Sequence, residues 1–146
     1  MRFLLSCLLL LSLPSHAQDA RPAALADIGT TALGLALGAA EANSLGIATV
    51  PLKFALISYA DTLPDGEKQE AHAALSAAWT GAAVNNVCVI AAIVTGGAFA
   101  PACVAIGLAT VIQQWQASAH ERQFWVLCST QRKEQPNLRC TYTTPG

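Results

Sequence analysis

The sequence contains a long central stretch without a strong charge. Residues 71–120 contain no Asp, Glu, Lys or Arg, and apart from cysteines their only titratable side chains are His72 and His120, near the two ends of the stretch. Charged residues make up 12% of the whole sequence, against roughly 25% in an average soluble domain. So long an apolar segment must be hidden from water, either by lipid or by neighbouring helices.

Helix-forming residues dominate the chain. Alanine and leucine are abundant, and runs of alternating β-branched residues joined by hairpin turns are missing. Within the apolar stretch, Gly96-Gly97 followed by Pro101 indicates a reversal and therefore a helical hairpin. We expect an all-α fold: a small helical bundle of about four helices with a central apolar helical hairpin and a C-terminal disulfide loop. The helices are predicted at about residues 22–41, 50–60, 64–94 and 101–124.

The N-terminal segment has the organisation of a secretory signal sequence. Arg2 precedes an apolar run over residues 3–13, and the segment ends in Ser15-His16-Ala17, which resembles an A-x-A cleavage site. The run is shorter than the about 20 residues that a membrane-spanning helix needs. We therefore expect a cleaved signal peptide over residues 1–17, a helical bundle over 18–127, and a polar disulfide loop and tail over 128–146.

The cysteine count agrees with export to an oxidising compartment. Of the 5 cysteines, Cys7 lies in the expected signal peptide, and the other four make an even number, which indicates two disulfides. Sequence alone permits three pairings, of which we favour pairing between neighbours in the chain. That choice joins Cys88 to Cys103 across the predicted reversal, and Cys128 to Cys140 around a polar segment.

The polar segment is the candidate surface for a protein partner, although a solvated loop without a partner explains it equally well. Its charged residues are Arg132, Lys133, Glu134 and Arg139.

The apolar hairpin fits either a membrane or the core of a soluble bundle. Glycine and alanine are frequent in it, and such small residues let helices approach closely in lipid, which favours membrane insertion. Asn85 and Asn86 oppose that interpretation, because buried amides need hydrogen-bond partners. If all predicted helices cross the membrane, Cys88 and Cys103 lie near its inner end, where oxidation is difficult to explain.

A polar face is predicted on the first helix. Asp27, Thr31 and Glu41 recur there at helical spacing, together with Gly34 and Gly38. Lys53 is the natural counter-ion, and a turn near residue 47 would place it beside Glu41. The candidate buried polar cluster is thus Asp27, Thr31, Glu41 and Lys53. The plainer alternative is that Glu41 ends a helix and Lys53 extends to an interface.

One local resemblance supports the membrane interpretation. Residues 27–31 (DIGTT) and 41–44 (EANS) resemble the D-x-x-T-T and E-x-N-P pattern of some uncharacterised small bacterial membrane proteins. The resemblance covers residues 27–44 only, and Ser44 stands where the pattern has proline. It implies a membrane setting and no particular activity.

Each candidate catalytic or metal-binding pattern in the sequence is explained better by a structural role. Glu70 and His72 point to different faces of a helix, and His120-Glu121 lacks a second histidine at zinc-binding spacing. We find no G-x-S-x-G or phosphate-binding loop, and no basic patch for nucleic acid. We therefore expect a non-enzymatic protein without a cofactor, exported to a bacterial cell envelope, either its membrane or the periplasm. The alternatives are a soluble periplasmic binding or inhibitor module and a secreted membrane-active toxin.

Overall fold

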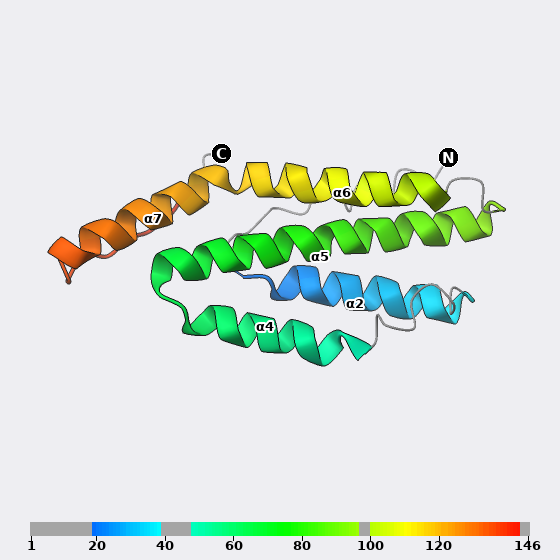
Figure 1. Cartoon of the computed structure of the whole chain (residues 1–146), viewed down its shortest axis with the longest axis horizontal. Helices are drawn as coiled ribbons and strands as arrows, with labels where there is room; N and C mark the ends of the chain where they lie inside the picture. The colour runs from blue at the N-terminus through cyan, green and yellow to red at the C-terminus, as the bar shows by residue number, and fades with distance from the viewer. Residues whose placement is uncertain (1–18, 39–47, 97–99, 144–146) are drawn as a thin grey trace.

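The computed structural model describes residues 19–38, 48–96 and 100–143, and this part of the chain is all α-helical (Figure 1). It holds five helices and no strand, so the expected fold class is confirmed, although the helix count differs from the four expected. The helices are α2 (Arg21–Ala36), α4 (Val50–Thr62), α5 (Asp65–Val94), α6 (Ala100–Ala117) and α7 (Ala119–Glu134). The expected signal peptide lies outside the described residues.

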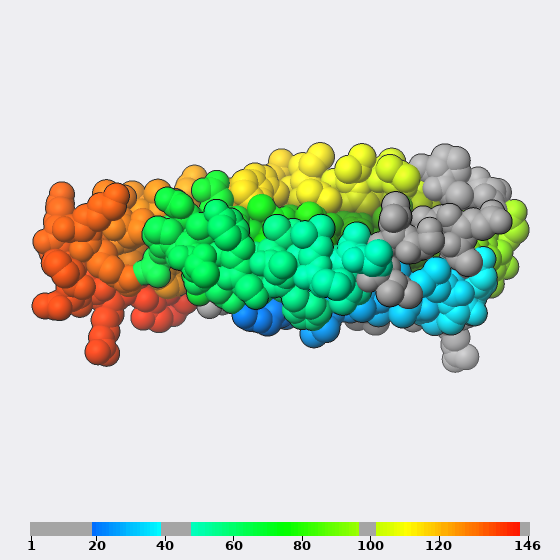
Figure 2. All heavy atoms as spheres, turned by 60° about the horizontal axis from the view of Figure 1, so that its bottom comes forward, coloured from blue at the N-terminus to red at the C-terminus, as the bar shows by residue number. Residues whose placement is uncertain are grey.

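Helix α5 forms the axis of an elongated bundle. Helices α6 and α7 run back along one side of it, and α2 and α4 cover the other side (Figure 1). In the space-filling view, α4 lies over one face of the same elongated shape (Figure 2). Each of the other four helices packs against α5.

Helix α2 is shorter than predicted. It begins with Pro22 in its first turn, where proline costs no hydrogen bond, and it ends at Ala36. Gly38 follows with a φ of 91°, a left-handed conformation that glycine adopts easily and that ends many helices. The continuous helix predicted over residues 22–41 is therefore interrupted after Ala36, and the rest of that prediction, with the turn predicted near residue 47, lies outside the described residues.

The predicted helix over residues 101–124 is two helices, interrupted at Ser118. The Ser118 hydroxyl donates to the carbonyl oxygen of Trp115 (3.0 Å), and the Arg122 guanidinium donates to the same oxygen (3.0 Å). The guanidinium carbon of Arg122 also lies 3.5 Å from the centre of the Trp115 ring. These side-chain bonds compete with the helical ladder and account for the break.

Helix α7 continues through much of the segment that was expected to be a loop. It ends at Glu134, so residues 129–134 are helical rather than irregular. Glu121 in its first turn and Arg132 and Lys133 in its last turn complement the helix dipole, which explains the extension. Cys128 and Cys140 are paired, with their Cα atoms 6.2 Å apart, and fold the following segment back on α7.

The α5–α6 hairpin is packed through glycines. A Cβ atom on Gly81 would lie 2.7 Å from the carbonyl oxygen of Gly107, and a Cβ atom on Gly107 would lie 2.9 Å from the carbonyl oxygen of Gly81. The two backbones are therefore in direct contact, as in helix pairs packed through small residues. Toward the turn, Cys88 and Cys103 are paired with their Cα atoms 5.3 Å apart, as the neighbour pairing predicts.

Candidate functional site: a buried polar cluster

The largest concentration of buried polar groups lies where α2, α4 and α5 meet. Asp27 on α2, Lys53 on α4 and Asn86 on α5 are 5%, 7% and 8% exposed. Thr31, one turn after Asp27, is buried beside them. Each of the three helices thus contributes at least one buried polar side chain to the cluster.

The hydrogen bonds of the cluster converge on Asp27. The Lys53 ammonium lies 2.5 Å from Oδ2 of the Asp27 carboxylate, and the Asn86 amide donates to Oδ1 at 2.9 Å. The same amide nitrogen lies 3.0 Å from the Thr31 hydroxyl oxygen and 3.3 Å from that of Thr30. Both carboxylate oxygens are therefore satisfied within the protein. The arrangement is a closed, hydrogen-bonded ion pair to which three helices contribute.

The structure brings three of the four residues of the predicted polar cluster together. Asp27, Thr31 and Lys53 lie in one network, whereas Glu41 lies outside the described residues. The counter-ion of Lys53 is Asp27, because the antiparallel α4 places Lys53 beside the middle of α2 rather than beside its end. Asn86 was missed as a member, although a polar amide within an uncharged helix is a signal that could have identified it.

A second polar group gathers at the start of α5, and we call it the charged end. Asp61, at the end of α4, accepts from Arg21 (2.6 Å), Lys68 (3.1 Å) and His72 (3.1 Å). Hydrogen bonds from Lys68, then from His72, hold the pKa of the Asp61 carboxyl at about 2, below its ordinary 3.8. The bond to Asp61 raises the pKa of Arg21 above its ordinary value. The charged end also includes the ion pair of Asp65 and Arg132.

Of the four charged residues in the candidate partner segment, one takes part in these interactions and three are exposed. Arg132 pairs with Asp65 and donates to the carbonyl oxygen of Leu138 (3.3 Å), so it anchors α7 and the following segment. Lys133 and Glu134 are exposed in the last turn of α7, and Arg139 is exposed beyond it.

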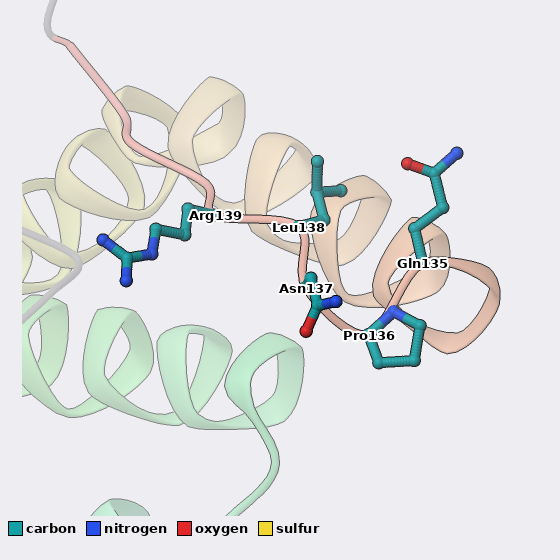
Figure 3. A pocket seen from close by; sticks show the side chains of 5 residues that line it. All are labelled: Gln135, Pro136, Asn137, Leu138 and Arg139. Carbon is teal, nitrogen blue, oxygen red and sulfur yellow. The ribbon is translucent and has the colours of Figure 1, made fainter.

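The hollow beside this segment does not have the geometry of a small-molecule site. It is about 550 Å³ in volume, and its lining side chains point in different directions instead of converging (Figure 3). They are Gln135, Pro136, Asn137, Leu138 and Arg139. Among the residues that the structure describes, no three His, Cys, Asp or Glu side chains are placed to hold a metal ion.

Comparisons with known proteins add no family. A scan against protein-family models, a search of curated proteins and a search of solved structures each returned no significant match.

Proposed function

We propose that the chain is an exported, non-enzymatic envelope protein whose helical bundle is embedded in a membrane. The observation that carries the proposal is an inverted distribution of polarity along most of the bundle. Large apolar side chains are exposed on the outside of the bundle. The two charged side chains in the same part of the bundle, Asp27 and Lys53, are buried and pair with each other. A water-soluble bundle has the opposite arrangement.

The outward apolar surface extends over four helices, and we call it the apolar belt. Its members are large apolar side chains that are at least 38% exposed. They are Leu25 and Leu33 on α2, with Leu37 directly after it; Leu52, Phe54, Leu56 and Tyr59 on α4; Ile93 and Val94 on α5; and Val104, Ile106, Leu108 and Ile112 on α6.

The length of the belt suits a bilayer. Helix α6 has 18 residues and α2 has 16, which at about 1.5 Å per residue correspond to about 27 Å and 24 Å. The hydrocarbon core of a membrane is about 30 Å thick. Among the described helices, α5 is long and apolar enough to cross it, with a mean hydropathy of 1.7 over its most apolar window. Helix α4 is shorter and would cross only part of the membrane.

The charged end supplies the boundary that such a protein needs. Apart from the Asp27–Lys53 pair, the charged residues of the described chain precede Pro22, follow Ala60 on α4, lie in the first turns of α5, or follow Ser118. Tyr59, which is 65% exposed, and Trp115, which is stacked on Arg122, lie where the belt meets these charges. Aromatic side chains are enriched at membrane interfaces. We place the charged end and the Cys128–Cys140 segment on the outer side, where the latter is available to a protein partner.

Sodium carbonate extraction of three matched proteins tests the proposal. Leu108, 60% exposed on α6, and Leu127, 65% exposed on α7, are similarly exposed leucines, inside and outside the belt. The wild type is expected to remain in the membrane pellet. Leu108→Lys is expected to lower the pelleted fraction, since a lysine at the centre of a bilayer costs about 3 kcal/mol, whereas Leu127→Lys is expected to have little effect. Extraction of all three proteins into the supernatant contradicts membrane embedding and favours the soluble periplasmic module.

A second candidate function is that of a secreted membrane-active protein. The observation that favours it is the position of the Cys88–Cys103 pair, at the end of α5 remote from the charged end. If the charged end faces the oxidising compartment, this pair must be oxidised before the hairpin enters a membrane. Release of a trapped dye from liposomes at micromolar protein supports this function, and intact vesicles count against it.

A further inference from the structure

The start of α2 is held by a buried imidazole. His72 on α5 is 0% exposed, and its Nδ1 accepts a hydrogen bond from the backbone N–H of Ala20 (3.2 Å). Since Nδ1 accepts, the ring proton of the neutral imidazole is on Nε2, which lies 3.1 Å from Oδ1 of Asp61 and donates to it. Both ring nitrogens are thus used, and the bond to Ala20 requires neutral His72.

From this geometry we infer that His72 is an acid-sensitive latch: its protonation releases the N-terminal turn of α2 from α5. An imidazolium carries a proton on each nitrogen, so Nδ1–H would face the N–H of Ala20 in a site without water access. Two buried donors opposed in this way lose their hydrogen bond and repel each other. Histidine is the side chain that ordinarily changes charge between pH 5 and 8.

Charged groups from neighbouring elements surround the latch. Asp61 faces Nε2 from α4, Arg21 and Asp19 stand at the start of α2, and Lys68 lies one turn earlier on α5. Asp61 already pairs with Arg21 and Lys68, so its charge is largely compensated before His72 gains a proton. With a pKa of about 2, Asp61 also stays ionised throughout the range. Helix α7, which packs against α5 as well, contributes one buried carboxylate, Glu121.

Release of the latch would uncover apolar surface. Ala20 and Ala24 are 0% exposed and belong to a core cluster with Ala23, Ile57 and Trp79. The start of α2 is held to α5 at Ala20 and to α4 by the ion pair of Arg21 and Asp61, and its middle is held at Asp27, so loss of the Ala20 bond loosens only the first turn of α2. The expected product is a locally opened bundle rather than an unfolded chain.

Hydrogen exchange of the full protein at pH 7.5 and pH 5.5, corrected for intrinsic exchange rates, tests the latch. Wild type is expected to lose about tenfold protection at residues 20–26 on acidification, the equivalent of one buried hydrogen bond. His72→Asn keeps an acceptor near the position of Nδ1 but does not titrate, so its protection is expected to be equal at both pH values. His120→Asn, at the exposed histidine, and Glu121→Gln are expected to respond like wild type.

Two results would overturn the inference: unchanged protection of wild type at pH 5.5, or an equal loss in wild type and His72→Asn. If His72→Asn does not fold, nitrogen chemical shifts of the wild-type imidazole give an independent answer. They are expected to show the Nε2–H tautomer at pH 7.5 and an imidazolium at pH 5.5, at the pH where protection is lost. A His72 that stays neutral while residues 20–26 lose protection also rules out the latch. None of these measurements depends on membrane embedding.

Discussion

Removal of the Lys53 ammonium tests whether the polar cluster holds the bundle together. In Lys53→Met the chain keeps an unbranched side chain of similar length, but the Asp27 carboxylate, 5% exposed, is left without its cation. At 2.5 Å and an effective dielectric constant of about 20, the lost attraction is about 7 kcal/mol before desolvation is counted. Since removing one partner of a buried ion pair costs about 3–5 kcal/mol net, we expect a loss of stability of that size.

The double variant Asp27→Asn/Lys53→Met separates charge pairing from packing. An asparagine at position 27 is neutral and still offers an oxygen to the Asn86 amide, which donates there at 2.9 Å in the wild type. The double variant is therefore expected to be more stable than Lys53→Met alone, with a coupling free energy of about 2 kcal/mol or more. The assay is reversible unfolding followed by circular dichroism at the helical band. It is carried out in one detergent on four proteins: the wild type, Asp27→Asn, Lys53→Met and the double variant. A loss below about 1 kcal/mol in Lys53→Met, or strict additivity of the two single changes, would refute the closed ion pair.

Two further changes probe helix packing and the charged end. Gly81→Ala is expected to lower the free energy of unfolding by about 1–3 kcal/mol, because its Cβ would meet the Gly107 backbone at 2.7 Å. The control Gly29→Ala, with nothing within 4 Å of the new Cβ, is expected to be neutral or slightly stabilising. Equal effects of the two changes would contradict the close helix contact. Asp61 has a folded pKa of about 2, below its ordinary 3.8, so its contribution to stability is complete above about pH 4 and is lost as the pH falls through about 2. Asp61→Asn is expected to flatten acid unfolding below pH 4, and an unchanged profile would show that the carboxylate carries no such linkage.

Local sequence signals were sufficient for much of the fold. The reversal at Gly96-Gly97 was predicted from glycine and proline, and α5 ends at Val94, with Gly96 at a φ of 89°. The start of α4 at Val50 follows from the proline in its first turn. Local signals failed at Ser118, because the break depends on Arg122 reaching back to Trp115, and no propensity scale describes that contact.

The polar cluster was only partly predictable, for a physical reason. The spacing of Asp27 and Thr31 places them on one helix face, which is a local property. The partner Asn86 is 59 positions from Asp27 in the chain, and its role depends on how α2 docks along α5. Likewise, the sequence offered Glu41 as a partner for Lys53 beside the alternative of an interfacial lysine, whereas the structure pairs Lys53 with Asp27 on the middle of α2.

The most direct measurement of where the apolar belt lies is the collision accessibility of a nitroxide label attached at Leu108 and, in a second protein, at Leu127. Oxygen concentrates in the bilayer core, whereas a charged nickel chelate stays in water. Oxygen should strongly enhance the spin relaxation of the label at 108 and nickel should affect it little, and the label at 127 should show the reverse. Strong relaxation enhancement by nickel at both positions, in protein reconstituted into lipid vesicles, would mean that water, and not lipid, surrounds the bundle.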